Sequence, residues 1–245
     1  MTEPDQPSSP FARRGFIAAA AVVALIVVAA LVIAITGGSD SDPAPQAGGS
    51  TPTSAPASTP AASSGECDQP AGDQLPPVTA PDNDWELVGK LIAPTDPEGA
   101  GPGKVTAEGL RTCFAHDPTG ALFAAVNWIG TTTDAELAEA AANDLTAPGP
   151  GRDAVLAAFA DDPTSVVGDA SGGFQVTGFT FLTYTGDVAM ISLALGLVDG
   201  GQASMPVTLE WSGTDWLMQL AADGNIGTGI QELPTLAGYV PWSGA

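Results

Sequence analysis

Apolar and polar positions follow three successive patterns along the chain. Residues 15–36 are apolar almost without interruption, whereas residues 37–65 contain no Leu, Ile, Val, Met or aromatic side chain. From residue 66 onward, apolar positions recur first with a helical period and later with the alternation of strands. The pattern predicts a short tail at 1–14, an apolar helix at 15–36, a linker at 37–65 and a folded domain at 66–245.

The apolar segment has the length of a membrane span. About 20 residues at 1.5 Å per residue give roughly 30 Å of helix, the thickness of a bilayer's hydrocarbon core. Arg13 and Arg14 precede the segment, and the next basic residue is Lys90. The positive-inside rule then predicts a single-pass protein of the cell membrane, with a cytoplasmic N-terminus and an extracytoplasmic C-terminal domain. A cleaved export signal is the alternative, because the arginine pair is followed by Gly15 and Phe16.

Residues 37–65 are rich in Ser, Thr, Pro, Ala and Gly. Such a segment cannot bury enough apolar surface to offset the entropy lost on ordering, so we expect a disordered linker.

The first half of the domain shows helical signals. Asp117 and Pro118 are typical of an N-cap and first helical position, and Gly130 is expected to end that helix. Thr133 and Glu136 have the spacing of a capping box, which predicts a second helix from residue 133. A third, short helix is expected over residues 152–160, after the break at 147–151. Before these helices, only residues 85–92 have the pattern of a strand.

Strand signals dominate from residue 173. Residues 173–186, 187–200, 202–211 and 215–220 are β-branched, aromatic or alternating, and short turns separate them. Helices followed by antiparallel strands indicate the α+β class. We therefore expect three N-terminal helices packed on a curved antiparallel sheet, preceded by one transmembrane helix and the disordered linker.

Two cysteines, Cys67 and Cys113, lie on the predicted outer side of the membrane. An even count in an oxidising compartment favours a disulfide, which would stabilise a loop of this length by roughly 4 kcal/mol. The alternative pairs Cys113 with His116 as nucleophile and base, which requires a free thiolate. A zinc site at the same residues would lack two ligands.

The net charge is −22, and no Lys or Arg follows Arg152. So acidic a chain repels phosphate backbones, and we expect no direct binding of nucleic acid.

Three segments resemble the nuclear-transport-factor-2-like roll: "DPTGALFAAVNW", "GFQVTGFTFLTYTGDVAMISLALGLVDGG" and "VTLEWSGTDWLMQL". The overall layout, closing on "GYVPWSGA", is similar to actinobacterial membrane proteins found with conjugative elements. More distantly it resembles the TcpC-type assembly subunits of conjugation and type IV secretion machines. Those subunits carry two such rolls, whereas this chain has room for one.

The resemblance implies a cystatin-like α+β roll and a membrane-anchored structural subunit that acts through protein–protein contacts. The expected partners are other membrane subunits of a transfer apparatus, or a second copy of the chain. The alternative is an extracytoplasmic module that binds a small molecule or peptide in an apolar pocket of the roll. We expect no enzyme, cofactor or metal. The aromatic candidates for the pocket, or else for the core, are Phe179, Phe181, Tyr184, Trp211 and Trp216.

Overall fold

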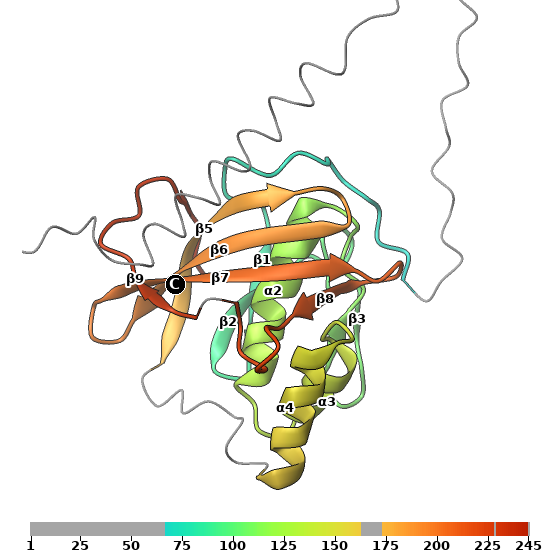
Figure 1. The fold of residues 1–245 in the computed structure, drawn as a ribbon. Helices are drawn as coiled ribbons and strands as arrows, with labels where there is room; N and C mark the ends of the chain where they lie inside the picture. The colour runs from blue at the N-terminus through green and yellow to red at the C-terminus, as the bar shows by residue number, and fades with distance from the viewer. Residues whose placement is uncertain (1–66, 163–172, 228, 245) are drawn as a thin grey trace, which may run out of the picture. The chain divides into compact units, whose positions relative to one another are not determined.

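The computed structural model describes residues 67–162, 173–227 and 229–244 (Figure 1). In these ranges the chain first forms four short strands, β1 (Asp84–Val88), β2 (Leu91–Thr95), β3 (Lys104–Val105) and β4 (Arg111–Thr112). The helices α2 (Pro118–Thr132), α3 (Ala138–Asp144) and α4 (Pro150–Asp161) follow. The remaining strands are β5 (Phe174–Tyr184), β6 (Val188–Leu197), β7 (Gln202–Trp211), β8 (Trp216–Gln219), β9 (Gln231–Glu232) and β10 (Val240–Pro241).

The largest sheet is antiparallel, with the strand order β10-β5-β6-β7-β8, and β9 pairs with β7. Its long strands are joined by hairpin turns, so β6 lies between its sequence neighbours β5 and β7. The face that packs inward carries alternating apolar residues, as the sequence predicts for residues 202–211. The buried members of that strand are Ala203, Met205, Val207 and Leu209.

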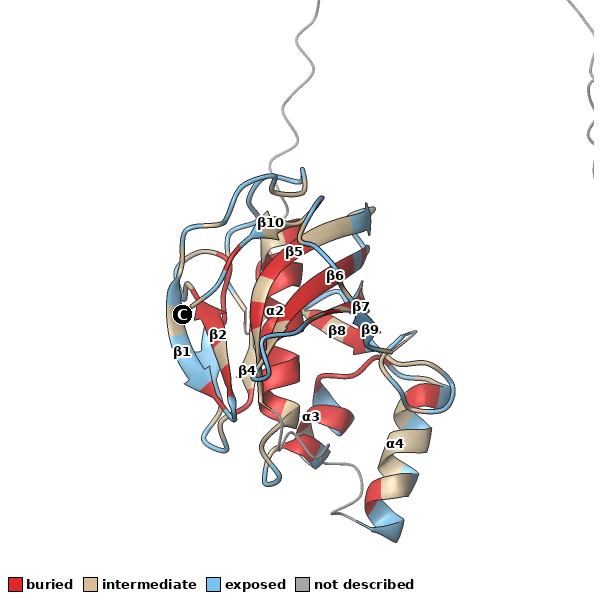
Figure 2. Cartoon of the chain, turned by 90° about the vertical axis from the view of Figure 1, so that its left-hand side faces the viewer, coloured by how far each residue is buried: buried red, intermediate tan, exposed pale blue. Residues whose placement is uncertain are grey.

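Helix α2 is buried almost all round because it lies between two layers. Figure 2 shows it enclosed by the β1–β2 hairpin on one side and by the large sheet on the other. The amide of Asn127 donates a 3.0 Å hydrogen bond to the carbonyl of Pro94 in β2. Asp117 caps the helix as predicted, accepting a 2.7 Å hydrogen bond from the Gly120 N–H. A helix apolar on both faces is what a central position requires.

The predicted architecture of three N-terminal helices packed on a curved sheet is wrong. In the described residues, four strands precede the helices, which lie between residues 118 and 161. The expected strand at 85–92 is instead a hairpin, because Gly89 turns the chain at a φ of 57°. A Cβ at Gly89 would collide with the carbonyl oxygen of Gly130 and with Thr133. Tertiary contacts with α2 therefore split this apolar run into β1 and β2.

The second predicted helix start is also wrong. Thr133 is the C-cap of α2, and its hydroxyl binds the Gly130 carbonyl instead of capping a new helix. The Glu136 N–H binds the carboxylate of Asp134, and α3 begins only at Ala138. Helix α4 was expected to pack on the sheet. It buries only Gly151 and Phe159, so it does not lie flat there (Figure 2).

The structure does not support the predicted single-pass membrane localisation in the residues that it describes. No helix in residues 67–162, 173–227 or 229–244 is long and apolar enough to cross a membrane. The longest, α2, has 15 residues, or roughly 22 Å of helix against about 30 Å of hydrocarbon. The predicted tail at 1–14, span at 15–36 and linker at 37–65 lie outside the described residues.

Candidate functional site

An apolar cavity of about 900 Å³ opens between the helices and one end of the large sheet. The helices contribute the lining residues Trp128, Ile129, Ala138, Ala142, Val155 and Phe159. The strands, the β6–β7 turn and the loop after β8 contribute Phe174, Leu197, Val198, Met205, Leu220, Ile226 and Ile230.

The deep walls of the cavity are held in place by burial. Trp128, Phe159 and Met205 are all buried. The indole N–H of Trp128 also donates to the hydroxyl of Thr146 at 3.2 Å. Phe159 anchors α4 against Ala138 and Ala142 of α3 in a small hydrophobic cluster. The inner walls are therefore shaped by the fold before any ligand enters.

The mouth of the cavity carries its polar groups. Asp199, in the β6–β7 turn, and Asp223, in the loop after β8, are both exposed lining residues. The Asp199 carboxylate accepts a hydrogen bond from the Gly201 N–H at 2.9 Å. Hydrogen bonds from the side chain and backbone N–H of Asn225 lower the pKa of Asp223. No Lys, Arg or His is among the described residues that line the cavity.

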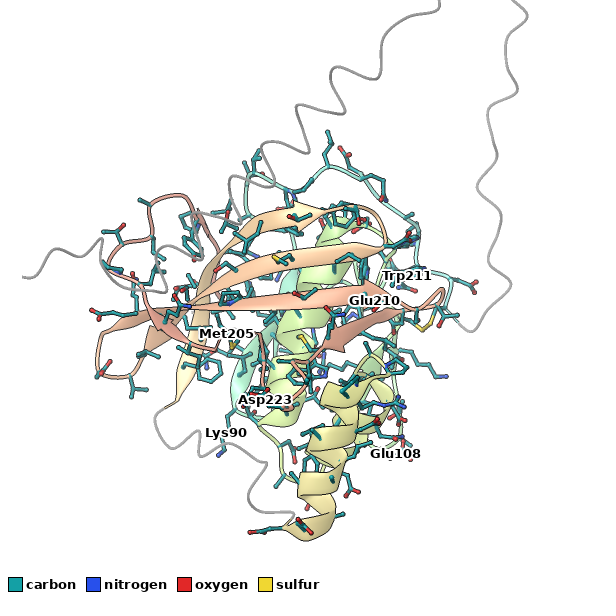
Figure 3. The ribbon with its side chains drawn as sticks, in the orientation of Figure 1. Lys90, Glu108, Met205, Glu210, Trp211 and Asp223 are labelled. Atoms are coloured by element: carbon teal, nitrogen blue, oxygen red, sulfur yellow. A yellow bond between two sulfur atoms is a disulfide. The ribbon has the colours of Figure 1, made fainter. Side chains whose placement is uncertain are left out.

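None of the five predicted aromatic candidates lines this cavity. Figure 3 shows Met205 and Trp211 toward opposite ends of β7, and the cavity lies at the Met205 end. The five rings pack on one another at the other end of the sheet, with centroid separations of 5.4 to 6.4 Å. The sequence left open whether these aromatic side chains belong to the core or to a pocket, and the geometry favours the core. The five aromatic residues are Phe179, Phe181, Tyr184, Trp211 and Trp216.

His116 belongs to this aromatic end. Its ring stacks on Trp211 with centroids 4.0 Å apart, and its Nε2 lies 3.0 Å from the carbonyl oxygen of Gly186. The carboxylate of Asp187 is 3.8 Å away. Burial, together with the charges of Asp117 and Asp187, raises the pKa of Tyr184 to about 12. The phenol of Tyr184 therefore stays neutral at physiological pH.

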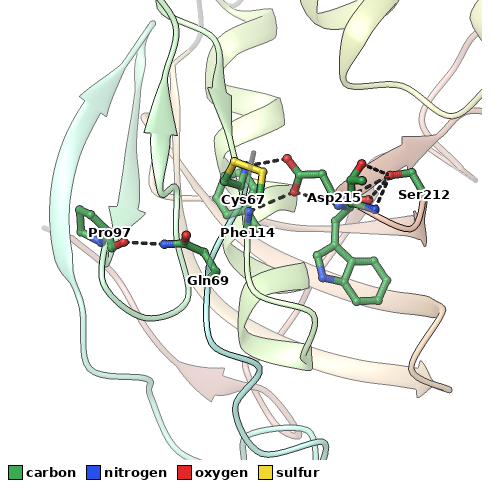
Figure 4. Close-up of a disulfide and its surroundings, with 9 residues drawn as sticks. Cys67, Gln69, Pro97, Phe114, Ser212 and Asp215 are labelled. Atoms are coloured by element: carbon green, nitrogen blue, oxygen red, sulfur yellow. Dashed lines mark hydrogen bonds between the residues drawn. A yellow bond between two sulfur atoms is a disulfide. The ribbon is translucent and has the colours of Figure 1, made fainter. Parts of the chain in front are cut away.

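The predicted disulfide between Cys67 and Cys113 is confirmed (Figure 4). The bond leaves Cys113 no thiol, so the nucleophile pairing with His116 is wrong. In the described residues, no cluster of three His, Cys, Asp or Glu is placed to hold a metal.

A partly buried carboxylate, that of Asp215, binds the backbone at the disulfide-bonded Cys113. Asp215 accepts hydrogen bonds from the backbone N–H groups of Cys113, Phe114 and Trp216 at 2.6, 3.1 and 2.9 Å (Figure 4). Cys113 has a φ of 66°, a left-handed conformation that costs a residue with a Cβ free energy. Burial raises the pKa of Asp215, although the three N–H groups act in the opposite direction. No sequence pattern identifies Asp215 as a functional or structural side chain; the turn "SGTD" is its only local signal.

The residues around the cavity were partly visible in the sequence. Val155 and Phe159 fall in the third helix expected over residues 152–160, and Met205 falls at an apolar position of the alternating segment 202–211. Their local patterns did not show that packing leaves space among them.

Comparison with known proteins returns one family. A model described as a domain of unknown function, DUF8175, matches residues 46–241. No curated protein and no solved structure matches the chain. The comparisons name no nuclear-transport-factor-2-like protein and no conjugation subunit, so the resemblance found in the sequence stays a prediction.

Proposed function

We propose that this chain, which belongs to the DUF8175 family, is a binding module that holds a small molecule or a peptide segment in its apolar cavity. One observation carries the proposal: a space of about 900 Å³ walled by apolar side chains from three helices and three strands. Pockets for small ligands typically enclose roughly 300–1,000 Å³, are mostly apolar and have a few polar groups.

The driving force for binding is the removal of apolar surface from water. Each Å² of apolar area that a ligand covers contributes about 25 cal/mol, before the costs of association are subtracted. Because the inner walls are buried side chains of the folded core, little ordering of the protein is needed. An apolar ligand body fits these walls, while polar atoms of the ligand lie toward the mouth.

Binding is tested with a neutral fluorescent probe, N-phenyl-1-naphthylamine, titrated into the full chain. We expect saturable enhancement with a stoichiometry of one. Val198 lines the mouth and is 77% exposed, so Val198→Asp leaves the core intact while placing a charge in the site. We expect it to weaken probe binding by about fivefold or more, from roughly 1 kcal/mol of lost apolar contact.

Leu87→Asp is the matched control, because Leu87 is 70% exposed on β1 and does not line the cavity. Its probe affinity should equal that of the unsubstituted chain. Unsaturable binding, or equal losses in the two variants, would contradict a specific cavity.

A second candidate function is that of a structural subunit of a conjugation or type IV secretion-like apparatus, acting by protein–protein contacts. An exposed apolar cluster at the β5–β6 hairpin favours it. Val188 and Met190 are exposed on one face of β6, and Leu182 is exposed in the irregular stretch of β5 beside Met190. Exposed apolar clusters of this kind often mark protein contacts. The partners would be other subunits of the apparatus, or a second copy of the chain.

This role is tested by DNA transfer from cells whose only copy of the gene encodes Val188→Asp/Met190→Asp. We expect transfer to fall, and a photo-crosslinker at Met190 to capture subunits of the apparatus. Leu87→Asp, which also adds a charge at an exposed apolar position, should leave transfer unchanged. Normal transfer after deletion of the gene would overturn this second role and leave the cavity proposal untouched.

A further inference from the structure

We propose that the ligand of the apolar cavity is a small amphiphile with a cationic head, an alkyl or ring body that carries an amine or quaternary ammonium group. The inference rests on the proposed binding function and names the ligand class for the same site. The cavity selects the apolar body, and the charges around its mouth select the head.

The charged residues that line the cavity, among those that the structure describes, have one sign. Asp199 and Asp223 are exposed lining residues, one from the β6–β7 turn and one from the loop after β8, and Figure 3 labels Asp223. In the part of the chain that the structure describes, neither carboxylate is within salt-bridge distance of a Lys, Arg or His side chain. The hydrogen bonds that lower the pKa of Asp223 keep it ionised well below neutral pH.

One basic residue, Lys90 in the β1–β2 turn, lies near the mouth, but it is not among the described residues that line the cavity. The chain has no Lys or Arg after Arg152, so β5, β6, β7 and the loop after β8 contain no Lys or Arg side chain. Arg111 pairs with Glu86 at 2.6 Å, and Arg152 binds the carbonyl oxygen of Asn143. Lys90 is the basic residue whose backbone approaches the mouth, with its N–H bound to the hydroxyl of Thr133 at 2.8 Å.

The charge balance decides between head groups. A neutral ligand that covered the mouth would remove water from two carboxylates without replacing it, which costs free energy. An anionic head would face like charges at short range. A cationic head instead pairs with the carboxylates while its body fills the apolar interior. The resulting attraction is partly exposed to solvent and must weaken with ionic strength.

The test compares three probes that share a ten-carbon body: decyltrimethylammonium, 1-decanol and decanoate. Each competes with N-phenyl-1-naphthylamine on the full chain, below micelle-forming concentrations and at low salt. We expect the ammonium probe to bind best and decanoate worst. Asp199→Asn/Asp223→Asn should weaken the binding of the ammonium probe about fivefold without weakening the binding of decanol.

The substitutions keep the local hydrogen bonds, because an asparagine oxygen can still accept from the N–H groups of Gly201 and Asn225. Asp187→Asn is the matched control: its side chain is 81% exposed at the opposite end of the sheet. It should leave the affinities of all three probes unchanged. Thermal melting of each variant verifies that the fold is retained.

The outcomes separate this inference from the function on which it rests. Equal affinity for the three probes would leave the binding cavity in place and overturn the cationic ligand. Ammonium binding that is insensitive to Asp199→Asn/Asp223→Asn, or as sensitive to Asp187→Asn, would also overturn it. If neither the fluorescent probe nor any competitor binds, the proposed function itself fails.

Discussion

Asp215 should be among the most costly polar side chains to remove from this protein. Its carboxylate accepts three backbone N–H groups, two of which belong to Cys113 and Phe114 at the start of the segment that leads into α2. Asp215→Ala removes the acceptor for all three N–H groups at once. It also removes a constraint on Cys113, whose φ of 66° is held by its neighbours and by the disulfide.

The magnitude follows from the hydrogen bonds between segments. A hydrogen bond to a charged acceptor contributes about 1.5–3 kcal/mol, so the bonds from Cys113 and Phe114 together suggest ~3–6 kcal/mol. The raised pKa of Asp215 indicates that the cost of burying its charge exceeds the benefit of the three N–H groups to the ionised form, which reduces this gain. We therefore expect a loss near the lower end, about 3 kcal/mol in the free energy of unfolding. Asp215→Asn retains one acceptor oxygen and should cost about half as much.

The assay is urea unfolding at pH 7, followed by the fluorescence of the chain's tryptophans. Asp187→Ala is the control, because Asp187 is an exposed aspartate in the β5–β6 turn and should change the free energy by about 0.5 kcal/mol or less. A loss below ~1 kcal/mol for Asp215→Ala, or a loss equal to that of Asp187→Ala, would refute the reasoning.

Three further predictions concern the phenol, the hairpin and the disulfide. Tyr184, whose pKa is raised to about 12, should ionise near that value by absorbance at 295 nm in a Tyr239→Phe background. Because the folded-state pKa lies above the unfolded value, its contribution to stability is complete below pH 10 and is lost as the pH rises through 12; a midpoint near 10 would contradict this. Gly89→Ala should cost ~2–4 kcal/mol in urea unfolding, because both its φ and its contacts with α2 exclude a Cβ. Gly213→Ala, with positive φ and open space, should cost only about 1 kcal/mol. Replacing both cysteines by Ala should lower the free energy of unfolding by ~2–4 kcal/mol, and an unchanged urea midpoint would count against a stabilising bridge.

Local pattern sufficed for the elements whose signals lie within a few residues of one another. The Asp117–Pro118 cap and the alternation in residues 202–211 predicted the start of α2 and the inward face of β7. The disulfide could be predicted from the number of cysteines, which is two, and from the expected oxidising compartment. These features depend on backbone propensity, side-chain period and covalent chemistry, all of which can be read from adjacent positions.

The tertiary structure decided the features that join distant residues. Gly89 turns the β1–β2 hairpin against Gly130, and Thr133 serves the end of one helix instead of the start of the next. Asp215 reaches Cys113 across 102 positions of sequence. The cavity depends on how far α4 stands from β5–β7. Apolar periodicity states which side chains face inward, but the space left among them depends on the packing of whole elements, which no local pattern contains.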